Sequence, residues 1–268
     1  MKDIVIAFLR AVVPAKFRSR LRAIFNRVRY FGFRYKCPFC NSHLRQFLPD
    51  GDNCAALKEK GVIGDGYRPN VHCPVCGSFD RERLIYLYLE HRTNIFEQPQ
   101  KLLHVAPEPT LKSILQKQAN IDYLTADLIS KSVMVRMDLC NIRYPDNSFD
   151  AIICCHVLEH IVDDRKAISE LYRILKPRGW AILQVPMALS TESTYEDYSL
   201  TCPSERARAF GHAGHVRIYG KDYKDRLEQI GFSVDVFKWC NEKDSFGGQE
   251  NKFGLIENEC VLLASKPA

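Results

Sequence analysis

The stretch from 138 to 186 constrains the fold of this chain more than any other part of the sequence. It contains two near-continuous apolar runs, Phe149–Cys155 and Trp180–Val185. Between them, apolar residues recur three and four positions apart after Asp163 and Asp164, as in a helix with acidic residues in its first turn. Unbroken apolar runs suit strands that are buried on both faces of a parallel sheet. The order of these segments predicts a strand, a helix and a second strand, and so an α/β fold.

The second half of the chain continues this pattern. We expect the helix of the βαβ unit to end at the turn residues 177–179. A long polar insertion, residues 187–210, follows the second strand and is typical of a lid or substrate loop. A further helix is expected over 223–230. Further strands are expected at 101–105, 121–126, 133–137, 232–237 and 260–265.

Two segments of this half carry a specific resemblance. DNSFDAIICCHVLEH (146–160) and ELYRILKPRGWAILQVP (170–186) resemble the fourth and fifth strands of class I S-adenosylmethionine-dependent methyltransferases, of the type 11 group. The resemblance extends from about Lys101 to the C-terminus. It implies a Rossmann-like methyltransferase sheet of strand order 3-2-1-4-5-7-6, with S-adenosyl-L-methionine as the cofactor and methyl transfer as the activity.

The first strand of that sheet leads into a turn that differs from the family's pattern. The family has an acidic residue followed by three alternating glycines, whereas this chain has HVAPEPT at 104–110. His104 replaces the acid, Ala106 the first glycine and Glu108 the second. A carboxylate at 108 suits the ammonium group of the cofactor. The alternative is a turn that is stiffened by its prolines and holds no ligand.

Four further cofactor positions follow from the resemblance, each after a strand. Asp127 would accept hydrogen bonds from the ribose hydroxyls, although an exposed loop aspartate is the simpler alternative. Asp138 matches the acid near the adenine amino group, and Leu139 would face the ring. His156 ends the fourth strand, at the edge where ligands bind in open parallel sheets. His160 is expected to be a structural histidine.

A glycine-flanked segment near the C-terminal third supplies the candidate catalytic groups. His215, Arg217 and Tyr219 alternate, so in an extended segment they share one face. A proton acceptor, a cation and a hydroxyl together suit a polar or anionic acceptor. We predict that His215 is the general base or orients the acceptor, with His156 as the rival base. The alternative is a solvated surface loop.

Two C-P-x-C motifs precede the methyltransferase-like region. Cys37 and Cys40 form one pair, and Cys73 and Cys76 form the other, 32 residues further on. Each tight turn directs two thiolates at one point, so the two pairs predict a tetrahedral, structural zinc site. Redox dithiols, buried cysteines and iron are the alternatives. The odd total of eleven cysteines, with this spacing, favours a reducing compartment over a secreted disulfide scaffold.

The first 36 residues carry the positive charge of the chain. They contain ten Lys and Arg and one Asp, whereas the remainder has 28 basic and 31 acidic residues. A short apolar segment, 4–13, ends at Pro14, and Asp3 and Arg10 argue against a cleaved signal in residues 1–15. Beyond it an apolar stripe with arginines on both sides predicts a basic amphipathic helix. Such a helix suits an anionic membrane surface. Docking on its own domain is an equal alternative, and nucleic-acid contact a weaker one.

These observations divide the chain into a basic helical arm (1–36), a zinc-ribbon-like module (37–77), a connecting helix (78–100) and a class I methyltransferase domain (101–268). We predict a cytoplasmic enzyme, peripheral on the membrane, that methylates a polar small molecule or a glycan-type acceptor. The slightly acidic body makes nucleic acid a less suitable substrate. Two alternatives stay open: an RNA methyltransferase with a zinc knuckle, and a non-catalytic scaffold that binds the cofactor.

Overall fold

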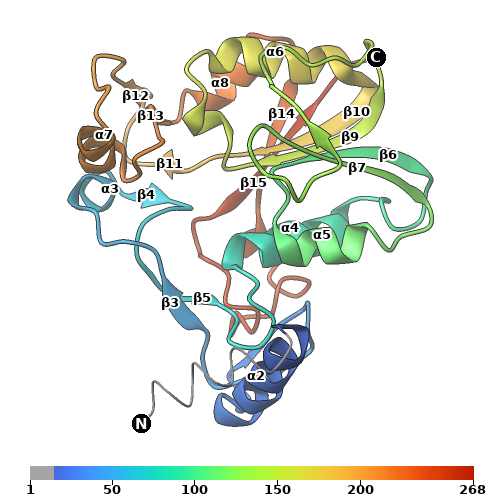
Figure 1. Cartoon of the computed structure of the whole chain (residues 1–268), viewed down its shortest axis with the longest axis vertical. Coiled ribbons are helices and arrows are strands. Elements are labelled where there is room, and N and C mark those ends of the chain that lie inside the picture. Colours follow the sequence, from blue (N-terminus) through green and yellow to red (C-terminus); the bar gives the residue numbers. More distant parts are fainter. Residues whose placement is uncertain (1–14) are drawn as a thin grey trace.

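The computed structural model describes residues 15–268, so the apolar segment 4–13 lies outside the described part. A seven-stranded sheet organises the molecule (Figure 1). All its neighbouring strands are parallel except at β15, which is antiparallel to both neighbours. Numbered along the chain, the order is 3-2-1-4-5-7-6. In space the strands are β14 (Ser233–Lys238), β15 (Cys260–Ser265), β10 (Leu175–Gln184), β9 (Phe149–Cys155), β6 (Gln100–Val105), β7 (Ile121–Asp127) and β8 (Val135–Arg136).

Helices cover both faces of this sheet, which makes three layers (Figure 1). On one face lie α6 (Asp164–Ile174) and α8 (Tyr223–Glu228), whose apolar side chains share one buried core with the strands. On the other face lie α4 (Asp80–Arg92) and α5 (Pro109–Leu115), with a second buried core. The connecting helix predicted in 78–100 therefore packs directly on the sheet.

The end of α6 differs from the expectation. No separate turn occupies 177–179, because β10 begins at Leu175, directly after the helix. The pairing with β9 is irregular between Leu175 and Trp180, and Arg178 has a left-handed φ of 65°. A β-carbon at Gly179 would lie 2.8 Å from the carbonyl oxygen of Asp150. Proline and glycine therefore mark a bulge inside a strand here and not a loop.

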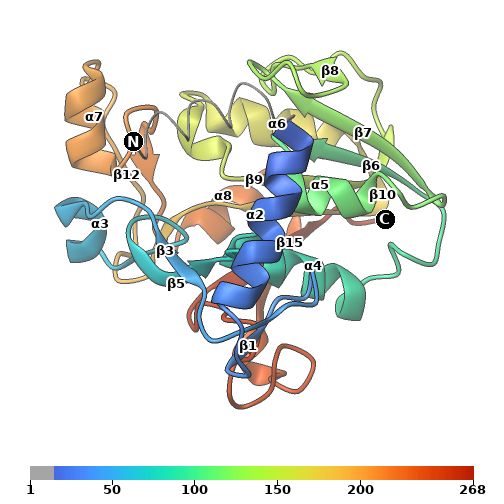
Figure 2. The same cartoon turned by 60° about the horizontal axis from the view of Figure 1, so that its bottom comes forward.

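Each cysteine pair lies in a loop next to a small antiparallel sheet. One consists of β1 (Tyr35–Lys36) and β2 (His43–Leu44), and the other of β3 (Leu48–Asp50) and β5 (Arg68–His72). The helix α2 (Ala15–Arg29) precedes them and lies on the outer side of α4 and α5 (Figures 1 and 2). Among residues 15–268, no helix is long and apolar enough to cross a bilayer.

The segment between β3 and β5 leaves the cysteine module and joins the methyltransferase-like half. Its helix α3 (Ala55–Glu59) contacts α7 (Pro203–Phe210), and its strand β4 (Val62–Ile63) pairs with β11 (Met187–Ala188). The polar insertion after β10 thus contains β11, β12 and α7, and β12 (Tyr195–Glu196) pairs with β13 (Arg217–Ile218). Two inserts that are distant in sequence therefore lie together beside the sheet.

Candidate active site

A cavity of about 460 Å³ opens at the carboxyl ends of the parallel strands. Ligands of open α/β sheets bind at this edge, near the point where the strand order reverses. That point lies between β6 and β9 here. Five of the seven positions expected to bind the cofactor line this cavity: Ala106, Asp127, Asp138, Leu139 and His156. The other two, His104 and Glu108, lie in the adjoining turn.

The turn after β6 keeps a backbone that normally requires glycine. Ala106 has a φ of 45°, in the left-handed region, at the position of the family's first glycine. His104 is fully buried, and its two ring nitrogens lie 2.9 Å from the Tyr123 hydroxyl and 3.2 Å from Oε2 of Glu108. Burial acts to raise the pKa of Glu108, but the hydrogen bond and charge of His104 outweigh it and keep the pKa below its ordinary value. Glu108 is therefore a fixed carboxylate in the turn beside the cavity.

The two aspartates are positioned by the backbone that follows their strands. Oδ1 of Asp127 accepts hydrogen bonds from the N–H groups of Ile129 and Ser130, both at 2.7 Å. Oδ1 of Asp138 accepts one from the N–H of Cys140 at 2.9 Å. Within residues 15–268 no ion pair engages either carboxylate. Each therefore has an oxygen available to accept from a ligand hydroxyl or amine.

His156 and Glu159 form a buried pair at the end of β9. The backbone of His156 is also left-handed, with a φ of 56°, which is a sign of strain held at a functional site. Its Nδ1 lies 3.5 Å from Oε1 of Glu159. Nε2 of His156 and both Glu159 oxygens lack a hydrogen-bond partner in the described part of the chain. Burial, with the nearby charge of Arg81, lowers the pKa of His156 to about 3, and burial raises the pKa of Glu159.

His215 lies behind this pair. It is 6% exposed, and its Nδ1 is 3.3 Å from the carbonyl oxygen of Phe210. Its Nε2 lies 3.9 Å from Oε1 of Glu159, and its Nδ1 lies 3.8 Å from Oδ2 of Asp65. Burial lowers the pKa of His215 below its ordinary value. The structure thus places His215 and His156 around one carboxylate, although only His156 lines the cavity.

Arg217 and Tyr219 are buried in a bonding network and do not line the cavity. The guanidinium of Arg217 donates to the carbonyls of Leu158, Ile161 and Val162, which surround the turn that carries Glu159. It also pairs with Glu196 at 2.9 Å. Tyr219 donates its hydroxyl proton to Asp164 at 2.7 Å. The shared face expected for 215, 217 and 219 is therefore absent, because β13 covers only 217–218 and the side chains of Arg217 and Tyr219 are bonded inward.

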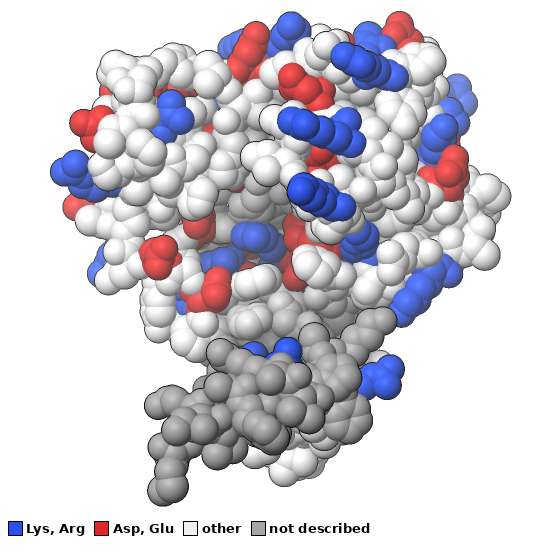
Figure 3. Space-filling model, in the orientation of Figure 1, with Lys and Arg blue, Asp and Glu red and all other residues white. Residues whose placement is uncertain are grey.

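The insert from the cysteine module forms one wall of the site. Gly64 has a φ of 88°, and a β-carbon there would lie 3.3 Å from both His156 Cε1 and Glu259 Oε1. Figure 3, which has the orientation of Figure 1, shows a hollow in the middle of the face that is turned to the viewer, with basic and acidic side chains on its floor. Glu259 is buried, and its Oε2 has no hydrogen-bond partner within 15–268. This loop therefore approaches the cavity closely only because it has no side chain there.

Three charged residues of this site have no signal in the sequence. Arg81, Asp65 and Glu259 come from α4, from the β4–β5 loop and from the residue before β15. No local pattern connects these three segments, so only the folded chain brings them to one edge. Glu159, by contrast, was within reach, because it lies between His156 and His160 in the VLEH segment.

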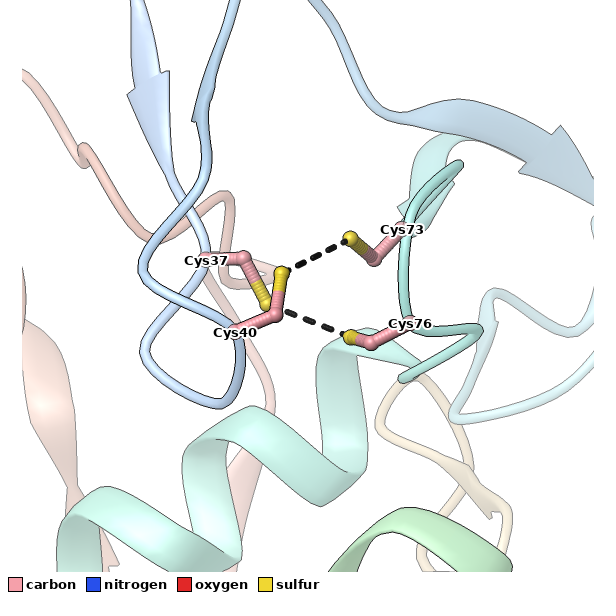
Figure 4. A group of neighbouring side chains, drawn as sticks. All are labelled: Cys37, Cys40, Cys73 and Cys76. Carbon is pink, nitrogen blue, oxygen red and sulfur yellow. Dashed lines mark hydrogen bonds between the residues drawn. The ribbon is translucent and has the colours of Figure 1, made fainter. Parts of the chain in front are cut away.

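The four motif cysteines form a second cluster, away from the cavity. Figure 4 shows that the two loops face each other with their sulfur atoms inward. Sγ of Cys37 lies 3.6 Å from that of Cys76, and Sγ of Cys40 lies 3.9 Å from that of Cys73. All four ligand atoms lie within 4.8 Å of one another, and all four cysteines are unbridged. A tetrahedral zinc ion with bonds of about 2.3 Å separates its sulfurs by about 3.8 Å, so the cluster fits this metal.

Comparisons with known proteins find similarity in the central part of the chain. Residues 93–183 match the family model described as "Methyltransferase domain". A sterol 24-C-methyltransferase of Aspergillus fumigatus is 28% identical over 120 residues, 38% of this chain and 31% of that protein. A ubiquinone/menaquinone biosynthesis C-methyltransferase of Pseudoalteromonas translucida is 40% identical over 60 residues, 22% of this chain and 20% of that protein. The chain thus spans about a third or less of the length of these two relatives.

The similar solved structures include a methyltransferase. The 1,6-didemethyltoxoflavin-N1-methyltransferase of Burkholderia thailandensis, solved with its acceptor and S-adenosylhomocysteine, is 14% identical with a TM-score of 0.47. The comparison covers 69% of this chain and 76% of that one. The family match covers about a third of the molecule. Within it, residues 93–183 are similar to a methyltransferase domain.

Proposed function

We propose that this chain transfers a methyl group from S-adenosyl-L-methionine to a polar small molecule or a glycan-type acceptor. The observation that carries the proposal is the cavity of about 460 Å³ at the carboxyl edge, which is lined by Asp127, Asp138, Leu139 and His156. When bound, S-adenosylmethionine supplies an electrophilic methyl group on a sulfonium. The 28 basic and 31 acidic residues after residue 36 give a slightly acidic body, which suits small polar acceptors better than a nucleic-acid backbone.

The residues of the cavity fit the chemical groups of this cofactor. The ribose hydroxyls need a carboxylate, and Asp127 has one oxygen fixed by two backbone N–H groups and the other available. Asp138 would accept a hydrogen bond from the adenine amino group, and the buried Leu139 forms an apolar surface for the adenine ring. The carboxylate of Glu108, held by His104, suits the ammonium group.

We assign the general-base role to His156 and a positioning role to His215. Nε2 of His156 is buried and unpartnered within residues 15–268, so it is available to accept a hydrogen bond or a proton. Such a ring can accept a proton from an acceptor hydroxyl or amine, and Glu159 lies close enough to stabilise the resulting imidazolium. His215 helps to hold Glu159 from the other side. Arg217 and Tyr219 position the turn that carries Glu159.

We infer that the four-cysteine cluster holds a structural zinc ion. With all four ligands supplied by the protein, such a site has no open position for substrate. The zinc would supply a rigid link between the loop at 37–40 and the loop at 73–76, which leads into α4. This loop pair lies apart from the cavity, so the metal takes no part in the reaction.

Calorimetric titration with S-adenosylhomocysteine tests the proposal. We expect the wild-type protein to bind it, and Asp127→Ala to weaken the binding by about 1.5–3 kcal/mol, the scale of lost charged hydrogen bonds. Asp122→Ala, which removes an exposed acid from the same strand, is the matched control. Absence of binding to the wild type would exclude methyl transfer and also the scaffold alternative.

Catalysis itself separates the enzyme from a scaffold that binds the cofactor. Polar metabolites and sugar derivatives are offered with the methyl donor, and release of S-adenosylhomocysteine is measured. For an acceptor found in this way, single-turnover rates of His156→Ala should fall by about 10²–10⁴, with donor affinity nearly unchanged. His215→Ala should cost less, because it acts through Glu159. A larger loss at His215 than at His156 would transfer the role of base to His215.

A further inference from the structure

The helix α2 has an apolar stripe that faces away from the rest of the molecule. In residues 15–29 and the turn after them, six large apolar side chains are between 50% and 79% exposed. Leu21, Ile24, Phe25 and Val28 are three or four positions apart, so they form one face of the helix. Phe31 and Phe33 extend the patch, with ring centroids 5.2 Å apart. A contiguous apolar patch of this kind on a protein surface marks an interaction site.

The opposite face of α2 already holds the helix on its own domain. Nδ2 of Asn26 donates to the carbonyl of Pro74 at 2.7 Å, beside the second cysteine pair. Arg27 donates to Ser42 Oγ and to the carbonyl of Cys40, beside the first pair. Tyr30 packs among the cysteines. At 3.6 residues per turn these contacts lie roughly half a turn from the stripe. Self-docking therefore uses a different face and leaves the stripe exposed.

The charges of α2 lie between these two faces. Arg20 flanks the stripe on one side, and Arg22 and Arg29 flank it on the other. All three are exposed, and the helix contains no acidic residue. Apolar groups in the middle and guanidinium groups at both margins match the boundary between acyl chains and anionic headgroups, which arginines reach from the side. A nucleic-acid surface would pair with the arginines but would leave the central apolar groups without a partner.

We propose that this face of α2, from Leu21 to Phe33, seats the protein on an anionic lipid membrane. The contacts at Asn26 and Arg27 fix the helix on the four-cysteine loops, so the membrane-facing stripe is presented in a defined orientation. Figure 2 shows α2 in front of α4 and α5, with no other helix or strand of residues 15–268 over it. This inference is independent of methyl transfer, because no residue of the stripe lines the cavity.

Co-sedimentation with vesicles tests the proposal on the full chain. The two vesicle types are phosphatidylcholine alone and phosphatidylcholine with phosphatidylglycerol. We expect binding to the anionic vesicles at low salt and at least tenfold weaker binding to the neutral ones. Binding should weaken as salt increases, because the arginines are exposed to solvent.

Two groups of variants and two controls locate the surface. Leu21→Ser with Phe25→Ser and Val28→Ser should reduce binding by at least tenfold while leaving the unfolding temperature unchanged, because these side chains are exposed. Arg20→Gln with Arg22→Gln and Arg29→Gln should reduce it about a hundredfold, since each arginine near a membrane contributes about fivefold. Controls elsewhere on the surface should bind like the wild type: Met134→Ser for exposed apolar area, and Lys117→Gln with Lys131→Gln and Lys238→Gln for charge.

Three results would overturn the proposal. The first is absence of binding to anionic vesicles at low salt. The second is a serine variant that binds as well as the wild type, since charge alone would then explain the attraction. The third is equal loss in the lysine control, which would indicate an effect of net charge and not of α2. Binding of RNA by α2, with vesicle binding absent, would give the surface to nucleic acid instead.

Discussion

Two residues at the carboxyl edge adopt a backbone that disfavours their side chains. Ala106 and His156 have φ angles of 45° and 56°, and each follows a central parallel strand directly. The left-handed region costs a non-glycine residue roughly 1–2 kcal/mol. Alanine, the smallest of the residues with a β-carbon, keeps the turn of the methyltransferase family without its glycine. The departure from the family's pattern therefore changes the residue but retains the shape of the turn.

The pair Ala106→Gly and Ala106→Val tests this interpretation. Glycine should raise the free energy of unfolding by up to about 1 kcal/mol, because it removes the β-carbon from a left-handed position. Valine should lower it by about 2 kcal/mol, because its branched side chain is still less compatible with that region. Urea unfolding of the three proteins measures both effects. If glycine and valine both destabilise by similar amounts, the turn is held by some feature other than this φ angle.

Glu259 predicts how stability depends on pH. Burial raises the pKa of its carboxyl to about 7, whereas an unfolded glutamate titrates near 4.5. The folded state therefore binds more protons than the unfolded state between these values, so stability falls as pH rises through this window. The loss is about 3 kcal/mol in total.

In Glu259→Gln, which cannot ionise, the decrease in unfolding free energy between pH 5 and pH 8 should be smaller by about that amount. Urea unfolding at both pH values measures it. Glu257→Gln is the control, since it removes an exposed glutamate two positions earlier. Equal pH dependence in wild type and Glu259→Gln would contradict the raised pKa.

At the scale of elements, α4 connects three parts of the molecule through its first turn. Asp80 pairs with Arg68 of β5 at 2.8 Å. Glu82 accepts hydrogen bonds from the first N–H groups of α5. Arg83 is fully buried and donates to four carbonyls, those of Val71, Ser78, Phe253 and Gly254. One helical turn thus joins the cysteine module, the helix α5 and the segment before β15.

Replacement of Arg83 should therefore destabilise the whole fold. Arg83→Met keeps most of the volume but leaves four carbonyls without their donor, so we expect a loss of about 3–5 kcal/mol. Arg92→Met, at the exposed end of the same helix, removes a surface pair with Glu242 at 3.4 Å and a contact with the Phe237 ring, and should cost less than about 1 kcal/mol. Thermal and urea unfolding of both variants make the comparison. A loss below about 1 kcal/mol at Arg83 would show that water satisfies those carbonyls.

The strands and turns of this sheet differ in how far they could be predicted from the sequence. The strands at 149–155 and 260–265 have the predicted bounds, because a buried strand is encoded by its own apolar run. The turn at 177–179 was wrong, because pairing with β9 makes these residues a bulge. Asp127 and Asp138 could be predicted as residues of the cavity from their places at or just after the ends of strands. Arg81 and Glu259 could not, because their neighbours come from distant segments.

Across the molecule as a whole, the segment that leads into the cysteine module is bonded to the loop that precedes β15. The N–H of Lys36 donates to the carbonyl of Lys252 at 2.8 Å, and Arg34 donates to the carbonyl of Glu250 at 2.8 Å. The module also holds α2 through Asn26 and Arg27. Its insert then extends to the polar insertion after β10, where β4 pairs with β11. A single metal ion between the two cysteine loops would thus stabilise the joint between α2 and the domain that contains the seven-stranded sheet.

Loss of that metal should be visible in both composition and stability. We expect elemental analysis to find about one zinc per chain in the wild type and little in Cys73→Ser. Because the two loops would then no longer share a metal ion, the free energy of unfolding should fall by at least about 3 kcal/mol. This lowers the midpoint temperature of unfolding by roughly 6–12 °C. Cys202→Ser, an exposed cysteine outside the cluster, should retain both zinc and stability. Donor affinity should persist in Cys73→Ser, since Asp127 and Asp138 follow strands of the sheet. Equal, negligible metal in all three proteins would remove the zinc site and leave the four sulfurs as ordinary buried thiols.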